Sequence, residues 1–202
     1  MAVYVIGGSP CSGKSTVAEA LSRQFGLRYV KVDDSLDRYL RMAADAGKPC
    51  CARAVAMTPD ETWMRDPQVQ CDEELAIYEE ISEHVLADLQ REAAGQDVIT
   101  EGAAWLPVLA ERFGIPHERY ISLTPDKAFQ VNHYSRREWV PHVLEGCTDR
   151  AAAFDNWMER DALFAKTVQQ QCAAAGYASV INSGDVSVGE LASRIASHFG
   201  LV

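Results

Sequence analysis

The chain has 202 residues, a length typical of one domain or of one domain with mobile inserts. Hydrophobic residues make up 48% of it and charged residues 24%, which argues against wholesale disorder. Its 29 acidic residues outnumber its 19 basic ones, and the net charge of -10 argues against nucleic acid or an anionic membrane as a partner.

Short apolar runs predict five strands. Residues 3–6 form such a run and end at Gly7 and Gly8, as expected for a buried strand. Further strands are predicted at residues 27–32, 98–100, 120–123 and 180–181.

Helical patterns separate these strands. A helix is predicted from about Gly13 to Gly26, because three apolar side chains share one of its faces. Asp34 or Ser35 is expected to cap the next helix. Residues 47–67 hold three prolines without periodicity and are expected to be irregular. Further helices are predicted at residues 75–95, 104–113, 126–137 and 149–176, and from Ser187 onward. Alternating strands and helices favour an α/β fold with a mainly parallel sheet.

The N-terminus and the cysteines indicate the compartment. The first residues carry no basic segment and run into a glycine loop, so we expect no signal peptide. No apolar run is long enough to span a bilayer. The six cysteines have no C-x-x-C spacing, and the five histidines are scattered, so neither predicts a metal site. We expect reduced thiols in a cytoplasmic protein.

The loop after the first predicted strand carries the most specific motif. Residues 8–15 match G-x-x-x-x-G-K-[ST], in which glycines let backbone N–H groups turn onto phosphate oxygens at the positive end of a helix. Lys14 can reach the β- and γ-phosphates, and the Ser15 hydroxyl can ligate magnesium. We expect a nucleotide to bind at Gly8, Ser9, Pro10, Cys11, Ser12, Gly13, Lys14, Ser15 and Thr16.

With this motif, the chain resembles the P-loop kinases related to nucleoside, nucleotide and shikimate kinases, most specifically at residues 3–16. The resemblance implies one domain over residues 1–202, a three-layer sandwich with a five-stranded parallel sheet in the order 2-3-1-4-5. It also implies ATP and Mg²⁺ as cofactors, an acceptor-binding region at residues 35–95 and a lid at residues 132–160. Residues 182–185 correspond to the loop against which the family places adenine.

Two carboxylates follow the second predicted strand. Asp33 and Asp34 are expected at the carboxyl edge of the sheet, where ligands of α/β proteins bind. In the family that the chain resembles, a carboxylate here holds the acceptor hydroxyl and can take its proton. That position maps best onto Asp33, with Asp34 as the alternate. Helix capping is the other interpretation, and we assign it to Asp34.

Glu101 ends the third predicted strand. The resemblance implies an acidic residue here that acts on Mg²⁺ through water, and Ser15 is the other predicted metal ligand. Many relatives carry aspartate at this position. Glutamate reaches further, so direct action as a base on the acceptor is an alternative. A partly exposed strand-end carboxylate that makes a local hydrogen bond is a third interpretation.

Three arginines are candidates for stabilising the transferring phosphoryl group. Arg136 and Arg137 end a predicted helix where the resembling kinases begin their lid. Arg160 lies in the next long helix, where the family often places a second phosphate-facing arginine. Asp161 shares a helical stripe with apolar residues and needs a partner, for which an arginine is the obvious choice. Ordinary surface charge is the alternative for each arginine.

The acceptor is less well defined. A nucleoside monophosphate acceptor requires an arginine clamp, but the basic residues between the second and third strands form no motif. These residues are Arg38, Arg41, Lys48, Arg53, Arg65 and Arg91. Trp63 and Tyr78 can stack on a ring, although isolated aromatic residues are more often part of the core.

The leading hypothesis is therefore a small-molecule kinase, with a hydroxyl acceptor favoured. In it, Lys14 and the glycine loop hold ATP and Mg²⁺, and Asp33 or Glu101 orients the acceptor. A nucleoside monophosphate kinase is the alternative, as is a nucleotide-binding switch protein without an acceptor. The sequence is compatible with a monomer or a homodimer.

Overall fold

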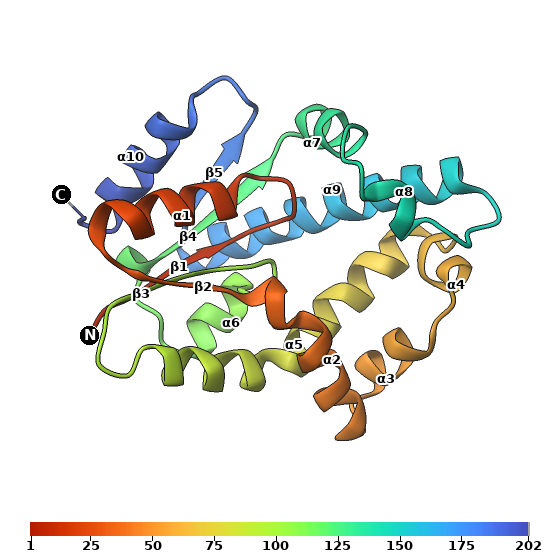
Figure 1. Ribbon diagram of the computed structural model, residues 1–202, viewed down its shortest axis with the longest axis horizontal. Helices are drawn as coiled ribbons and strands as arrows, with labels where there is room; N and C mark the ends of the chain where they lie inside the picture. Colours follow the sequence, from red (N-terminus) through yellow and green to blue (C-terminus); the bar gives the residue numbers. More distant parts are fainter. Residues whose placement is uncertain (202) are drawn as a thin grey trace.

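The computed structural model describes residues 1–201 of the chain as an α/β protein around one parallel sheet. The strands lie in the order β2-β3-β1-β4-β5 (Figure 1), so the predicted topology is confirmed. The strands are β1 (Val3–Gly7), β2 (Arg28–Lys31), β3 (Val98–Glu101), β4 (Tyr120–Pro125) and β5 (Ala178–Asn182). All residues of β3 and β4 are buried, including the polar residues Thr100, Glu101, Ser122 and Thr124.

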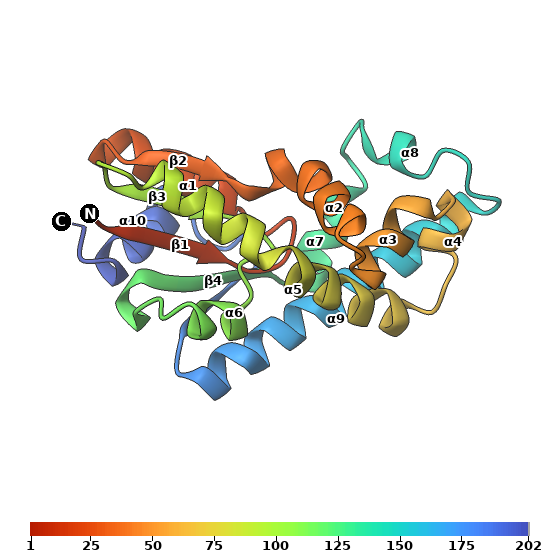
Figure 2. The same ribbon diagram turned by 90° about the horizontal axis from the view of Figure 1, so that it is seen from below.

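Helices cover both faces of the sheet and make a three-layer sandwich. α1 (Lys14–Phe25) and α10 (Val188–His198) pack on one face, and α5 (Pro67–Glu92), α6 (Pro107–Arg112) and α9 (Arg150–Ala175) pack on the other (Figures 1 and 2). Each face has its own hydrophobic cluster. Across residues 1–201, no helix combines the length and the apolar character needed to cross a membrane.

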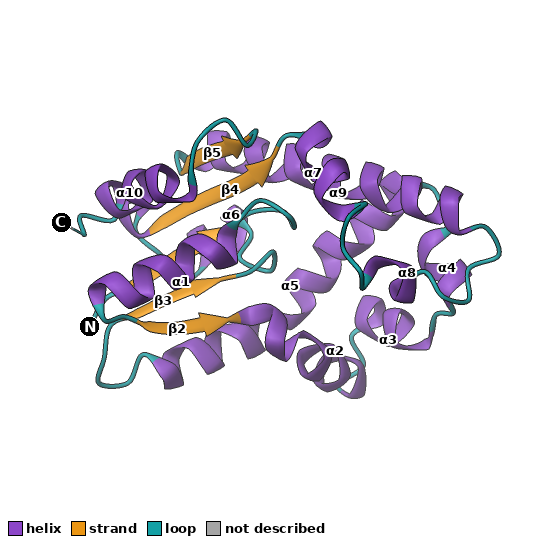
Figure 3. Ribbon diagram, turned by 45° about the horizontal axis from the view of Figure 1, so that its top comes forward, coloured by secondary structure: helices purple, strands orange, loops and turns teal. Residues whose placement is uncertain are grey.

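The remaining helices lie beyond the carboxyl ends of the strands. Together with parts of α5 and α9, they form a helical half of the molecule (Figure 3). They are α2 (Leu36–Asp45), α3 (Pro49–Ala56), α4 (Pro59–Trp63), α7 (Lys127–Tyr134) and α8 (Val140–Val143). Two short 3₁₀ turns complete the chain, η1 (Val32–Ser35) and η2 (His117–Arg119). Any ligand at the edge of the sheet is therefore flanked by this helical half.

The expectation that residues 47–67 are irregular is wrong. Pro49, Pro59 and Pro67 each occupy the first turn of a helix, where the missing N–H costs nothing. Thr58 and Asp66 cap α4 and α5 by accepting hydrogen bonds from backbone N–H groups. The prolines therefore start helices in this segment.

The prediction that Asp34 caps the second helix is also wrong. Asp33 and Asp34 lie inside η1, and the capping position of α2 is Ser35, whose side chain makes no capping hydrogen bond. The chain thus makes an extra 3₁₀ turn, which begins at the buried Val32, before α2 begins. Asp34 is exposed and forms an ion pair with Lys31 at 3.6 Å.

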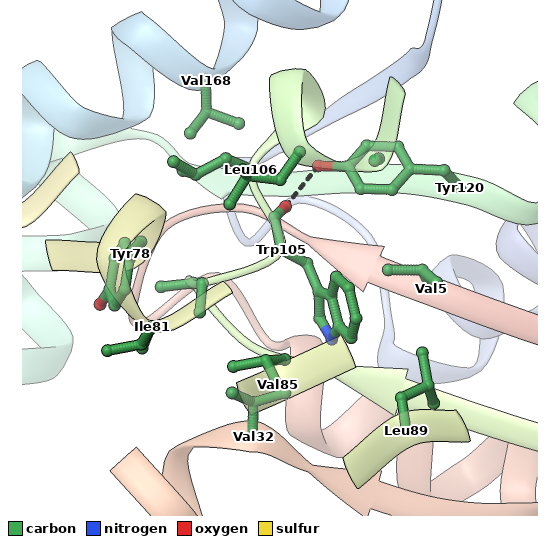
Figure 4. Packing of buried hydrophobic residues seen from close by; sticks show 14 of the residues in the cluster. Val5, Val32, Tyr78, Ile81, Val85, Leu89, Trp105, Leu106, Tyr120 and Val168 are labelled. Atoms are coloured by element: carbon green, nitrogen blue, oxygen red, sulfur yellow. Dashed lines mark hydrogen bonds between the residues drawn. The ribbon is translucent and has the colours of Figure 1, made fainter. Parts of the chain in front are cut away.

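A small polar network in the core fixes the end of β1 (Figure 4). The Tyr120 hydroxyl donates a 2.7 Å hydrogen bond to the carbonyl of Trp105, whose indole N–H donates to Thr100 Oγ1 at 3.0 Å. A Cβ on Gly7 would lie 2.2 Å from that hydroxyl and 2.3 Å from that carbonyl. Only glycine fits at this close approach, and the loop that follows starts from a fixed point.

Candidate active site

A cavity of about 610 Å³ opens at the carboxyl edge of the sheet. The glycine loop, the ends of β2 and β3, α5, α9 and the segment after α7 form its walls. Its lining residues are Pro10, Cys11, Ser12, Gly13, Lys14, Ser15, Thr16, Lys31, Asp33, Leu36, Tyr78, Glu101, Ala103, Tyr134, Arg137, Trp139, Trp157 and Arg160. Most of the predicted site residues therefore share one cavity, whereas Gly8, Ser9 and Arg136 do not line it.

The glycine loop has a backbone suited to anions. Gly8, Cys11 and Gly13 have φ angles of 115°, 60° and 92°, and such left-handed residues are typical of loops that turn their N–H groups inward. A Cβ on Gly8 would lie 2.0 Å from the carbonyl oxygen of Leu123. α1 begins at Lys14, so its positive N-terminal end faces the same cavity.

Lys14 is buried at the floor of this loop. Its ammonium group donates a 2.7 Å hydrogen bond to the carbonyl of Ser9. Burial lowers the pKa of Lys14, and the negative charges of Glu101 and Asp33 oppose that shift. The buried hydroxyls of Ser9 and Ser12 have no hydrogen-bond partner within residues 1–201. The loop thus contains polar groups that a bound anion would satisfy.

Glu101 is fully buried, in contrast to the partly exposed carboxylate of the third interpretation. The Tyr29 hydroxyl donates a 2.8 Å hydrogen bond to Glu101 Oε1. Oε2 has no hydrogen-bond partner in the part of the chain that the structure describes. Burial raises the pKa of Glu101, and Lys14 and the Tyr29 hydrogen bond oppose this. An unpartnered carboxylate oxygen therefore sits in the wall of the cavity.

The two consecutive aspartates differ in their position relative to the cavity. Asp33 lines the cavity and is exposed to it, whereas Asp34 does not line it. Since Lys31 and Glu101 are paired in register on neighbouring strands, Asp33 follows the strand end that lies beside Glu101. Of the two residues, only Asp33 is placed to meet a ligand of this cavity.

The two predicted lid arginines also differ in their position relative to the cavity. α7 ends at Tyr134, so Arg136 and Arg137 lie beyond the helix that was expected to continue to residue 137. The Arg137 guanidinium lines the cavity, 5.0 Å from the ring centre of Tyr134 and 5.5 Å from that of Trp139. It also donates to Cys11 Sγ at 3.6 Å. Arg136 is exposed and outside the cavity wall.

Arg160 lines the cavity, but two carboxylates hold its guanidinium. It pairs with Asp161 at 2.6 Å, as the apolar stripe predicted, and with Glu74 at 3.2 Å. The Tyr78 hydroxyl donates to the other oxygen of Glu74 at 2.9 Å. Burial raises the pKa of both carboxyl groups, and Arg160 opposes the shift. One guanidinium thus serves two buried acids.

The arginines of residues 35–95 are paired with acids of the same region. Arg38 and Arg91 both contact Asp88. Arg53 and Arg65 both contact Glu73, at 2.7 and 2.5 Å. None of these arginines, nor Arg41 or Lys48, is among the lining residues of the large cavity. The structure therefore brings no arginine clamp from this region to the cavity.

Two contributors to the site, Tyr29 and Glu74, were missed in the sequence, and Asn182 was predicted only as part of the loop at residues 182–185. Tyr29 and Glu74 bond to candidate site residues, and Asn182 Nδ2 donates a 3.0 Å hydrogen bond to the carbonyl of Ser12. A usable signal exists for Tyr29, because it is two residues before Lys31, the register partner of Glu101. Alternation along a strand puts residues two apart on one side of a sheet.

The comparisons with known proteins give structural similarity alone. No protein-family model matches the chain, and no curated protein matches its sequence. One similar solved structure is described as a "putative kinase" from Chloroflexus aurantiacus J-10-fl, with 16% identity and a TM-score of 0.43 over 98% of this chain and 97% of that one. Another is an uncharacterized protein from Eubacterium ventriosum ATCC 27560, with 13% identity and a TM-score of 0.48 over 99% of each chain. Similarities of this size assign neither a family nor an activity.

Proposed function

We propose that the chain is an ATP- and Mg²⁺-dependent phosphotransferase that moves the γ-phosphoryl group to a hydroxyl of a small-molecule acceptor. The observation that carries the proposal is the convergence of Lys14, Glu101 and Asp33 on one cavity, beside the glycine loop and the start of α1. These are the groups that phosphoryl transfer needs, because its catalysis consists mostly of positioning and charge stabilisation.

The nucleotide half of the proposal rests on the glycine loop. The N-terminal end of α1 and the buried ammonium of Lys14 supply positive charge where the β- and γ-phosphates would lie. The Ser12 hydroxyl, which belongs to a lining residue and has no hydrogen-bond partner within residues 1–201, is a further donor in the same loop. Together these groups favour a ligand with several anionic oxygens.

The metal half rests on Glu101 and Ser15. Mg²⁺ takes oxygen ligands and keeps several waters, so one carboxylate, one hydroxyl and the phosphates suffice to hold it. Residues 1–201 contain no cluster of three acidic, histidine or cysteine ligands, and a site shared with phosphates does not need one. The orphaned Oε2 of Glu101 fits such an ion. When bound, Mg²⁺ would neutralise charge on the phosphates.

Asp33 is the residue that we propose as the acceptor base. It is the one carboxylate of the cavity wall that is exposed, so an acceptor hydroxyl can reach it. It would accept the hydroxyl proton as the hydroxyl oxygen bonds to the γ-phosphorus, while the bond from that phosphorus to the β–γ bridging oxygen breaks and ADP leaves. Arg137 is the better supported lid arginine, since its guanidinium contacts aromatic rings and a thiol, whereas two acids hold Arg160.

A hydroxyl acceptor is favoured over a nucleoside monophosphate. An acceptor phosphate would require at least one arginine directed at it. The four arginines of the acceptor region that pair with Asp88 and Glu73 are held by these carboxylates, and none of them lines the large cavity, where the acceptor phosphate would have to lie.

The test is Mg²⁺-dependent ADP release from ATP in the presence of two acceptor panels, one of alcohols and one of nucleoside monophosphates. Lys14→Ala is expected to abolish transfer. Asp33→Asn is expected to lower turnover by at least about tenfold, whereas Asp34→Asn, its exposed neighbour outside the cavity, should retain it. Full activity of Lys14→Ala would overturn the proposal. Stimulation by monophosphates alone would overturn the hydroxyl acceptor, and ATP binding without any stimulation would favour a switch protein.

A further inference from the structure

A second cavity adjoins the active-site cavity at its acceptor end. Its volume is about 160 Å³, and Leu36, Tyr78 and Arg160 line both cavities. These three residues come from α2, α5 and α9, on the side of the large cavity away from the glycine loop. An acceptor that reaches Asp33 can therefore extend past Tyr78 and Arg160 into this side cavity.

One part of the side-cavity wall is apolar. Leu40, Ala54, Met57 and Ile77 supply it, from α2, α3, the residue after α3, and α5. Contact with such a wall favours a ligand with an aliphatic or aromatic body, because apolar surface is removed from water on both partners. The wall thus suits the body of a small molecule rather than a second highly charged group.

The charges around the side cavity are matched. Arg53 and Arg65 pair with Glu73, and Arg160 pairs with Glu74 and with the buried Asp161. Of these residues, Arg65, Arg160, Glu73 and Glu74 line the side cavity, so two guanidinium groups stand against two carboxylates in its wall. Neither sign of charge is in excess, so the far end of a ligand here is expected to be uncharged.

Apart from the ion-paired carboxylates, two buried polar atoms of the residues that line the side cavity have no hydrogen-bond partner among residues 1–201. Gln70 is 4% exposed, and its amide N–H groups donate to the carbonyls of Trp63 at 3.3 Å and of Arg65 at 2.8 Å. These bonds fix the amide, whose Oε1 has no hydrogen-bond partner among the described residues 1–201. Arg65 Nε is a buried donor that also lacks one there. A ligand group that both donates and accepts would satisfy the two atoms.

We propose that the side cavity binds the far end of the acceptor, and that the acceptor is an alcohol whose apolar body ends in an uncharged amide-type group. The inference rests on the proposed function for the reacting hydroxyl. Binding in the side cavity itself requires no nucleotide, so the two can be tested apart.

The first experiment measures binding of four probes of equal chain length to the full chain without ATP, by ligand-observed NMR. The probes are hexanol and three counterparts that keep its hydroxyl and carry an amide, a carboxylate or an ammonium group at the other end. Affinities of roughly millimolar strength are expected for ligands of this size. The amide probe should bind at least about fivefold more tightly than the other three. Binding of either ionic probe as tightly as the amide, or no binding by any probe, would overturn the proposal.

The second experiment fills the cavity. Ala54→Phe places a ring in its wall and should weaken binding of the amide probe by at least about tenfold, with ATP binding unchanged. Val55→Phe, at an exposed neighbour on the same helix, should leave probe binding intact. Gln70→Met should abolish the preference for the amide over hexanol. Unchanged probe binding by Ala54→Phe would overturn the inference while leaving phosphoryl transfer untouched. Absent phosphoryl transfer with Ala54-dependent probe binding would overturn the proposed function alone.

Discussion

Tyr29 and Glu101, on neighbouring strands, are joined by a hydrogen bond in which the phenol donates to Oε1 at 2.8 Å. The bond holds one carboxylate oxygen and leaves Oε2 buried and without a hydrogen-bond partner in the described part of the chain. A buried carboxylate with one neutral donor is costly unless another group binds it. Tyr29 is therefore a positioning residue for the oxygen that we propose as a magnesium ligand.

Tyr29→Phe should weaken Mg²⁺ binding without stopping the chemistry. Loss of one neutral hydrogen bond, about 1 kcal/mol, corresponds to a roughly fivefold higher Mg²⁺ concentration at half-maximal ADP release. Turnover at saturating Mg²⁺ should change little. Calorimetric titration of Mg²⁺ into the protein with a non-hydrolysable ATP analogue gives an independent value.

Tyr177→Phe is the matched control, because its hydroxyl donates to the carbonyl of Ile115 and does not line the cavity. It should lose similar stability and keep the normal Mg²⁺ dependence. If both variants had the same Mg²⁺ dependence, the Tyr29 bond would be only structural.

Asn182 should matter for nucleotide affinity, because its side chain ties the end of β5 to the glycine loop. Its Nδ2 donates to the carbonyl of Ser12 and its Oδ1 accepts from the N–H of Gly184. Asn182→Ala loosens the loop, and we expect ATP affinity to fall by about fivefold to thirtyfold, from two lost hydrogen bonds. Gln24→Ala, at an exposed position of α1, is the control. Wild-type ATP affinity in Asn182→Ala, measured by calorimetry, would contradict this role.

Gly8→Ala should be among the most damaging small substitutions. The residue has φ of 115°, and a Cβ there would lie 2.0 Å from a backbone oxygen of β4. The strain and the overlap together should cost several kcal/mol, about 3 or more. Gly189→Ala is the opposite case, since its Cβ would meet nothing closer than 4.0 Å in α10, and it should be neutral or stabilising by up to about 1 kcal/mol. Urea unfolding of both variants checks the contrast.

The sequence was sufficient for the sheet because its signals are local. Short apolar runs marked the five strands, and the glycine motif marked the β1–α1 loop. The partner of Asp161 was also predictable, because a carboxylate on an apolar helical stripe needs a neighbouring cation. In each of these cases, the residues of a single segment were enough for the prediction.

The parts that the sequence did not reveal depend on distant contacts. Val32 packs so closely against Gly102 that a Cβ on Gly102 would lie 2.8 Å from Val32 Cβ. Val32 also begins the turn η1, which includes Asp34 and removes it from the expected capping position. The pairing of Glu74 with Arg160 joins α5 to α9. No periodicity or spacing within one segment encodes such a pair.

The cluster of Glu74, Arg160 and Asp161 should respond asymmetrically to substitution. It holds two buried acids and one guanidinium, so Arg160→Leu leaves two buried carboxylates without a cation and should cost about 3–5 kcal/mol at neutral pH. Asp161→Asn removes the excess negative charge and should cost little or be stabilising. Urea unfolding at pH 7 measures both, and an equal cost for the two variants would contradict this view of the cluster.

The same cluster predicts how stability depends on pH. Burial raises the pKa of Glu74 and of Asp161 above their ordinary values, so between about pH 4 and the raised values the folded chain binds more protons than the unfolded chain. The stabilising contribution is thus complete below about pH 4 and is lost as the pH rises through the raised pKa. Asp161→Asn cannot titrate at this position. Its stability relative to wild type should therefore increase as the pH rises through the raised pKa of Asp161, and urea unfolding that showed a falling difference would contradict this.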